Sequence, residues 1–263
     1  MRPAAPLSIL LVLVLAAVAL AGCATPPPAS QPEALAAFRQ TNDPLEPTNR
    51  VLYSVSNRVA SVTLTPAARA YRAVVPEPVR NNVSNLLSNL GGPVRFANDV
   101  LQAKSRRAGD TLMRFLINST FGLGGLFDIA SGWGYPDHPS DIGMTLAVWG
   151  MPPGPYLFLP LLGPSDPRDT FGFAVSTVAS PLRALGSGPA VTAFNWATLG
   201  TTTISQYAQN LPGIESIKRT ALDPYATFRS LYRQHREAAI EAARKGRQRT
   251  IPVWFDLPKQ PSE

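Results

Sequence analysis

The chain is poor in the side chains that most enzymes use for catalysis and metal binding. It has one cysteine, Cys23, and two histidines, His138 and His235, in 263 residues. A single cysteine excludes an internal disulfide and a structural zinc site made of four cysteines or of two cysteines and two histidines. Neither a Gly-x-Ser-x-Gly nucleophile elbow nor a Gly-x4-Gly-Lys-Ser/Thr phosphate loop is present. The sequence therefore predicts no enzyme, no metal and no cofactor.

Charge is also scarce, whereas proline is abundant. Charged residues make up 16% of the chain, against roughly 25% in an ordinary soluble domain. The 27 prolines argue against long central strands and long straight helices, because proline lacks a backbone N–H donor. The formal net charge of +7 suggests an acidic partner without identifying it.

The first residues are typical of an export signal. Arg2 is the only charged residue before Glu33, and Leu7 to Ala21 is almost wholly aliphatic. This run is short for a membrane span and fits a secretory signal. It ends in Leu20-Ala21-Gly22-Cys23, which resembles a bacterial lipobox. The resemblance implies cleavage after Gly22 and acylation of Cys23, and the alternative is an ordinary signal with an accidental cysteine.

The position after the cysteine bears on localisation. By resemblance to enterobacterial sorting, Ala24 in place of aspartate points to the outer membrane. A Pro/Ala/Ser-rich tether follows, from Thr25 to Pro32. An exported lipoprotein makes nucleic acid an implausible partner for the positive charge.

Apolar residues recur mostly at helical spacing, which predicts a mainly α fold of short, kinked helices. The stripe in residues 79–90 is the clearest, and residues 51–59 and 111–120 show the same spacing. Asp166-Pro167 is expected to open a helix to about Ala179, and Asp223-Pro224 one to about Arg244.

Alternating strand patterns are absent from the sequence, apart from one candidate hairpin. It is predicted around Gly150 to Leu159, with its turn at Pro152 to Pro155.

The segment Ile142 to Ile214 contains only four charged residues, Asp166, Arg168, Asp169 and Arg183. Glycine, proline, serine, threonine and asparagine interrupt it, so it does not predict a spanning helix. Two explanations remain open: a deeply buried core, or a surface in contact with lipid or another membrane protein.

Two clusters have both a functional and a structural interpretation. The loop with Asp137, His138, Ser140 and Asp141 could form a hydrolase site around Ser140 and His138, or a turn with Asx-type hydrogen bonds. A basic stretch near the C-terminus is either a solvated helix face or a site for anionic headgroups. It contains Arg236, Arg244, Lys245, Arg247 and Arg249.

A series of motifs runs in order along the chain. They are Asp43-Pro-Leu-Glu-Pro-Thr-Asn-Arg50 with Tyr53, Arg80-Asn-Asn-Val-Ser-Asn85, Gly92-Pro-Val-Arg-Phe-Ala-Asn98, Arg114-Phe-Leu-Ile-Asn-Ser-Thr120, Gly122-Leu-Gly-Gly-Leu-Phe-Asp128, Asp141-Ile-Gly-Met-Thr-Leu146, Trp149-Gly150, Gly154-Pro-Tyr156, Leu159-Pro160, Gly163-Pro-Ser165 and Arg168-Asp169. Their order and spacing resemble those of the MlaA (VacJ) lipoproteins of Gram-negative bacteria, over about Asp43 to Arg236.

The resemblance implies a ring of helices around a central amphipathic channel, lipid-anchored on the periplasmic side of the outer membrane. It implies removal of phospholipids that have strayed into the outer leaflet. The expected partners are phospholipid, a trimeric outer-membrane porin and the soluble periplasmic lipid carrier of the Mla pathway. A lipoprotein that scaffolds porins or the envelope without moving lipid is the alternative.

The resemblance also implies site residues and domain limits. A channel gating loop would contain Gly150, Gly154, Pro155 and Tyr156. A membrane-interface helix would carry Asn49, Arg50 and Tyr53. The expected organisation is a signal peptide at 1–22, a lipidated N-terminus and tether at 23–40, a channel domain at 41–238 and a basic tail at 239–263.

Overall fold

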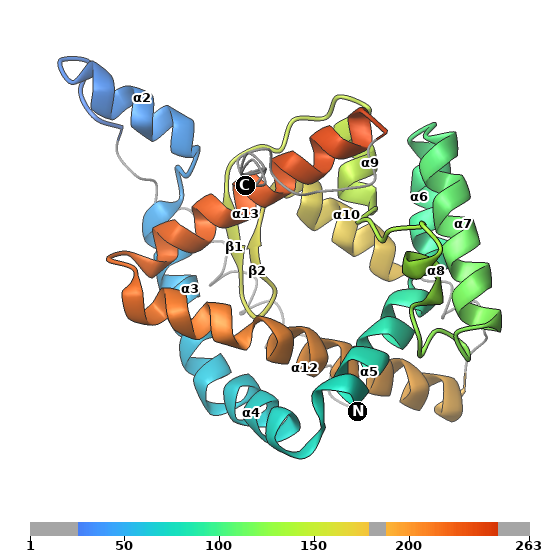
Figure 1. Ribbon diagram of the computed structural model, residues 1–263. Helices are drawn as coiled ribbons and strands as arrows, with labels where there is room; N and C mark the ends of the chain where they lie inside the picture. Colours follow the sequence, from blue (N-terminus) through green and yellow to red (C-terminus); the bar gives the residue numbers. More distant parts are fainter. Residues whose placement is uncertain (1–25, 179–187, 247–263) are drawn as a thin grey trace, which may run out of the picture. The chain divides into compact units, whose positions relative to one another are not determined.

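The computed structural model describes residues 26–178 and 188–246 (Figure 1). This part of the chain is mainly helical and has a single two-stranded hairpin, which confirms the predicted fold class. The helices are α2 (Pro32–Thr41), α3 (Glu46–Val62), α4 (Leu64–Val74), α5 (Glu77–Leu90), α6 (Gly92–Leu101), α7 (Ser105–Thr120), α8 (Ile129–Gly132), α9 (Ile142–Val148), α10 (Pro167–Val178), α12 (Pro189–Thr220) and α13 (Pro224–Arg244).

The two helices predicted from start and stop signals are present in the structure. Asp223 caps α13, because its side chain accepts a hydrogen bond from the N–H of Ala226 at 3.1 Å. Just beyond the helix, Gly246 takes a positive φ of 67°, the left-handed conformation that commonly ends helices. The helix expected after Asp166 is α10. Within the described residues no helix is long and apolar enough to cross a membrane.

The chain forms two compact units. Unit 1 comprises the chain up to Ser61 together with Pro153–Pro167, and unit 2 comprises Val62–Pro152 and the chain from Arg168 onward. Unit 1 therefore contains α2, nearly all of α3 and the hairpin, and unit 2 contains the helices from α4 onward.

The hairpin of unit 1 lies further along the chain than predicted. Strand β1 (Leu157–Leu159) pairs antiparallel with β2 (Gly163–Ser165), so the turn is 160–162 and not Pro152 to Pro155. The proline-rich segment 152–155 precedes β1 and lies outside the hairpin. Leu161 (φ 65°) and Gly163 (φ 91°) supply the left-handed conformations that the turn requires.

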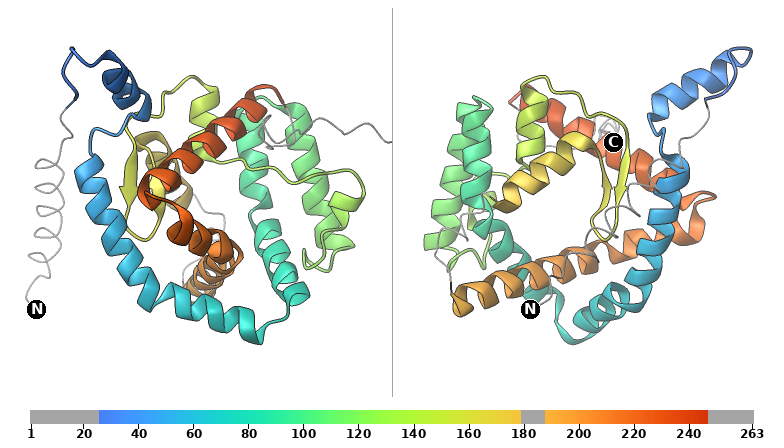
Figure 2. Two further views of the ribbon diagram at one scale, coloured as in Figure 1. Left: turned by 60° about the vertical axis from the view of Figure 1, so that its left-hand side comes forward. Right: turned by 180° about the vertical axis from the view of Figure 1, so that it is seen from behind.

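The helices of unit 2 make contacts that close a circuit. Helix α12 contacts α4, α5 and α13; α13 contacts α9; α9 contacts α6; and α6 contacts both α5 and α7. The views in Figure 2 show α6 and α7, in green, running side by side. Contacts thus lead from α12 through α5, α6, α9 and α13 back to α12.

Small residues allow the close helix contacts of unit 2. A Cβ on Gly172 of α10 would lie 2.5 Å from the backbone nitrogen of Gly143 in α9. A side chain at either position would therefore push the two helices apart. The adjoining core between α9 and α13 consists of Met144, Ala147, Ala239, Ile240 and Ala243.

Candidate functional site

Helix α3 of unit 1 places its polar side chains inward and its valines outward. Asn49 and Ser56 are buried, whereas Val51 and Val55 are 56% and 52% exposed and Val59 is also exposed. The valines recur every four residues and therefore share one face of the helix. A soluble protein normally buries such a stripe, so the exposed valines mark this face as a contact surface.

Asn49 fastens α3 to the hairpin. Its Nδ2 donates to the Asp43 carboxylate at 2.8 Å and to the Tyr156 carbonyl at 3.1 Å. Its Oδ1 accepts from the N–H of Phe158 at 2.9 Å. Nearby, the Tyr53 ring meets the Phe158 ring edge to face at 5.5 Å. Asn49 and Tyr53 therefore contribute to the packing of unit 1.

Arg50 lies differently from its two neighbours in the motif. Its guanidinium bonds the Glu46 carboxylate one turn earlier, at 2.7 Å, and both side chains are partly exposed. Arg50 and Arg58 flank Val51 and Val55 along an open groove on α3. Cationic side chains therefore border the apolar face.

The predicted gating segment is divided between the two units. In unit 1, Asn42 holds both ends of the Gly154–Pro155–Tyr156 stretch. Its Nδ2 donates to the Gly154 carbonyl at 2.7 Å, and its carbonyl accepts from the Tyr156 N–H at 2.8 Å. The Tyr156 side chain is buried. Gly150, in unit 2, follows α9 with a positive φ of 99° and no atoms near its missing Cβ.

Unit 2 shows the same inverted polarity along α7. The side chains that this helix buries include Arg107, Thr111, Arg114 and Asn118, while Leu112 and Leu116 are exposed. Further exposed apolar side chains of unit 2 occur in the charge-poor segment and on the loops beyond α7 and α9, among other places. They include Phe121, Leu123, Trp133, Trp149, Met151, Phe171, Phe173, Phe194, Trp196 and Leu199.

The loop that suggested a hydrolase is part of a buried polar network. His138 Nε2 lies 2.9 Å from Asp99 Oδ2, which also accepts from the Thr111 hydroxyl at 2.6 Å. Ser140 accepts from Gln102 at 3.1 Å. Burial alone would raise the pKa of Asp99, but hydrogen bonds from His138 and Thr111 outweigh it and lower the pKa. Both His138 and Ser140 are buried, so neither is placed to receive a substrate.

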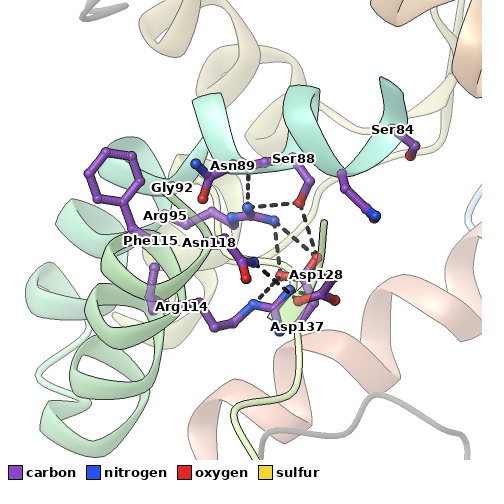
Figure 3. Close-up of a pocket in the computed structure, with 12 residues that line it drawn as sticks. Ser84, Ser88, Asn89, Gly92, Arg95, Arg114, Phe115, Asn118, Asp128 and Asp137 are labelled. Atoms are coloured by element: carbon purple, nitrogen blue, oxygen red, sulfur yellow. Dashed lines mark hydrogen bonds and ion pairs between the residues drawn. The ribbon is translucent and has the colours of Figure 1, made fainter. Parts of the chain in front are cut away.

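Asp137, the first aspartate of that loop, pairs with an arginine beside a polar pocket. Asp137 bonds Arg95 at 3.0 Å, on one side of the polar pocket of about 120 Å³ in Figure 3. Arg114 enters the same pocket and pairs with Asp128 at 3.1 Å. Burial raises the pKa of Asp128, yet hydrogen bonds from Ser131, Asn118 and Arg114 lower it overall. These opposite charges neutralise one another inside the pocket.

Arg236 forms ion pairs with two aspartates inside unit 2, a role that the basic stretch in the sequence did not indicate. It donates to both oxygens of Asp141, at 2.7 and 2.8 Å, and to Oδ1 of Asp169 at 2.8 Å. The Tyr232 hydroxyl donates to Asp169 as well, at 2.7 Å. This cluster joins α9, α10 and α13, so Arg236 belongs to neither a solvated face nor a headgroup site. A partial signal for it existed in the sequence: Asp169 is one of only four charged residues in the segment Ile142 to Ile214.

Other predicted residues lie outside the described part of the chain. These are Cys23, Arg247 and Arg249. Within the described part, no group of three or more histidine, cysteine or acidic side chains could hold a metal ion.

Comparison with known proteins gives a consistent result. The family profile of MlaA, the MlaA lipoprotein, matches residues 41–239. The intermembrane phospholipid transport system lipoprotein MlaA of Haemophilus influenzae is 32% identical over 232 residues, which cover 86% of this chain and 88% of the relative. The Escherichia coli K12 protein of the same name is 31% identical over 201 residues, 74% of this chain and 77% of its own.

A solved structure is similar as well. It belongs to work on the structural basis for maintenance of bacterial outer membrane lipid asymmetry, and it superposes with a TM-score of 0.64 at 31% identity. The match covers 75% of this chain and 98% of that chain.

Proposed function

Because the chain belongs to the MlaA lipoprotein family, we propose that it transports phospholipid at the bacterial outer membrane. It takes phospholipids that have strayed into the outer leaflet, passes them through an amphipathic channel and hands them to a soluble periplasmic carrier. The family match over residues 41–239 carries this proposal. The inverted polarity of α3 and α7 supports it, because outward-facing valines and leucines suit apolar surroundings.

The physical task needs no catalysis. A phospholipid has roughly 30 acyl methylenes, so moving it bare into water costs on the order of 25 kcal/mol. Moving its headgroup through hydrocarbon is costly too. A channel with polar walls lowers the cost of moving the headgroup. Direct handover to an apolar carrier avoids exposing the acyl chains to water.

The proposed anchor is a lipidated Cys23 after removal of residues 1–22. Several acyl chains, at roughly 0.8 kcal/mol per buried methylene, hold a protein in a membrane almost irreversibly. The outward face of α3 then lies at the membrane interface. Val51 and Val55 contact acyl chains there, and Arg50 and Arg58 lie near lipid phosphates.

The loop containing Gly150, Gly154, Pro155 and Tyr156 is the proposed gate. Bonds from Asn42, which ends α2, and from Asn49 of α3 hold its second half in place, so opening requires that these bonds break. Gly150 adopts a conformation that favours glycine, and no neighbouring atoms crowd its Cβ position.

Outer-leaflet phospholipid in a deletion strain tests the function. Deletion should raise the amount of outer-leaflet phospholipid that a surface-acting phospholipase or an amine-reactive reagent detects. The intact gene should return that amount to the level of the parent strain. A gene carrying Cys23→Ala should leave the amount of outer-leaflet phospholipid high. A deletion strain with no rise would count decisively against transport.

Scaffolding without transport is the competing function, and the exposed aromatic side chains of α12 would serve a porin contact equally well. A photocrosslinker at Trp196, which is 69% exposed, separates the two functions. Adducts with lipid inside the assembly favour transport, whereas adducts with porin alone favour scaffolding.

A further inference from the structure

A second polar pocket in unit 2 is unlike the neutralised pocket of Figure 3. It lies between α4, α5 and α12 and has a volume of about 250 Å³. Its lining includes Ser205, which is buried, Tyr71 and Arg80, which are partly buried, and Arg72 and Glu77, which are exposed. Side chains from three helices thus converge on one space.

Two hydroxyl groups of this pocket are buried without a hydrogen-bond partner among the described residues. They are the Ser205 Oγ and the Tyr71 hydroxyl, and Ser205 as a whole is only 2% exposed. Leaving a buried polar group unsatisfied costs about 1–3 kcal/mol. Both oxygens are closed to solvent, so a ligand with acceptor oxygens would satisfy them once the two side chains turn toward the pocket.

The two arginines are held in place by backbone carbonyls. Arg72 Nη1 donates to the Ala208 carbonyl at 3.0 Å, which Pro212, four residues later in α12, cannot bond because it lacks an N–H. Arg80 Nη1 donates to the carbonyls of Arg72 and Val75, at 2.9 and 3.2 Å. Within the described chain neither guanidinium has a carboxylate at ion-pair distance.

The start of α5 adds to the positive character of the pocket. Its N-cap position is Pro76, whose side chain cannot cap the first-turn N–H groups. Glu77 and Arg80, in the first turn, both line the pocket. The positive end of the helix dipole therefore lies beside the arginines and favours an anion.

We propose that this pocket binds the phosphate of a zwitterionic phospholipid headgroup, a phosphoethanolamine. Arg72, Arg80 and the two hydroxyls donate to the phosphate oxygens, and the Glu77 carboxylate pairs with the amine. A pocket of about 250 Å³ holds about eight water-sized groups, enough for a phosphate and a two-carbon amine. The assignment rests on the proposed transport of phospholipid and names a headgroup site for it.

Titration of the full chain in phosphate-free detergent tests the site. The probes are glycerophosphoethanolamine, glycerophosphate and inorganic phosphate. Arg80→Gln should weaken binding of glycerophosphoethanolamine at least tenfold, Arg80→Lys should restore part of it, and Ser205→Ala should weaken it about threefold. Glu77→Gln should weaken glycerophosphoethanolamine but not glycerophosphate.

Two controls separate binding from folding. Arg69→Gln is a matched change on α4, because Arg69 lies outside the pocket and pairs with Glu215 at 2.7 Å; it should leave binding unchanged. Ser205→Ala removes a hydroxyl that makes no bond, so the melting temperature should stay the same or rise.

Three results would overturn the assignment. They are binding of glycerophosphoethanolamine that ignores both Arg80→Gln and Ser205→Ala, binding of inorganic phosphate alone, and no binding of any probe. None of these results contradicts phospholipid transport if the deletion strain still accumulates outer-leaflet phospholipid. The headgroup site and the transport function are therefore tested separately.

Discussion

Arg236 on α13 donates to both carboxylate oxygens of Asp141, the residue that caps α9. Asp141 accepts from the N–H of Met144 at 2.8 Å as well, so one carboxylate starts a helix and ties it to a distant one. Arg236 continues from Asp141 to Asp169 on α10. A single guanidinium therefore links α9, α10 and α13 of unit 2.

Replacing Arg236 with Met should destabilise the protein by about 3 kcal/mol. This value is at the lower end of the range for breaking a buried ion pair, because the Asp141 side chain is 44% exposed. The urea midpoint of the detergent-solubilised chain measures the effect. Lys245→Met, which removes a surface ion pair with Glu241, is the control and should cost less than about 1 kcal/mol. Equal effects of the two changes would refute the role of Arg236.

Stability should fall with acid in a way that depends on Asp141. Burial raises the pKa of this carboxyl, but hydrogen bonds and charge attraction from Arg236 lower it below its ordinary value of 3.8. The contribution of Asp141 is therefore fully present above about pH 4 and is lost as the pH falls through the lowered pKa. Urea midpoints between pH 6 and pH 2.5 should decline less steeply in Asp141→Asn than in the unchanged chain. Parallel declines would contradict the assignment.

Asn49→Ala should loosen the hairpin of unit 1. The change leaves the buried N–H of Phe158 without its acceptor, at a cost of about 1–3 kcal/mol. Hydrogen–deuterium exchange should become faster in peptides that contain Phe158. Ser54→Ala is the matched control on α3, since its exposed hydroxyl bonds the Arg50 carbonyl of the same helix. In this variant, exchange in the peptides that contain Phe158 should not change. Unchanged exchange in Asn49→Ala would show that the hairpin does not need this residue.

A charge on the outward face of α3 should weaken membrane contact without unfolding the chain. In hydrocarbon, a charged side chain at position 55 would cost up to about 3 kcal/mol, whereas an exposed substitution in water changes stability by less than about 0.5 kcal/mol. Val55→Glu should therefore reduce quenching of a nearby fluorophore by brominated lipid, at an unchanged melting temperature. Ser54→Glu, at a position of the same groove that is already polar, is the control and should reduce quenching less. Strong quenching retained in Val55→Glu would place this face away from acyl chains.

Local sequence signals predicted some of the helices, namely those that contain residues 51–59, 79–90 and 111–120 and those that follow Asp166-Pro167 and Asp223-Pro224. Helical spacing, Asp223-Pro224 and Gly246 predicted the elements and several of their ends, because caps and prolines act on their own backbone neighbours. The hairpin was misplaced because a proline-rich stretch resembles a turn, while strand pairing depends on partners that propensity does not reveal. Periodicity alone could not show which way the valine stripe of residues 51–59 faces, since an outward and an inward stripe have the same spacing.

By itself, then, the sequence determined that this protein is a mainly helical chain with little charge and a lipobox-like start, and its ordered motifs pointed to the family. Those properties follow from residue type and order. Tertiary structure decided that the partly buried Arg236 links three helices, that His138 bonds Asp99 and that the hydroxyl of Ser205 has no hydrogen-bond partner beside a pocket. Such assignments depend on distances between side chains far apart in the chain, and only packing brings them together.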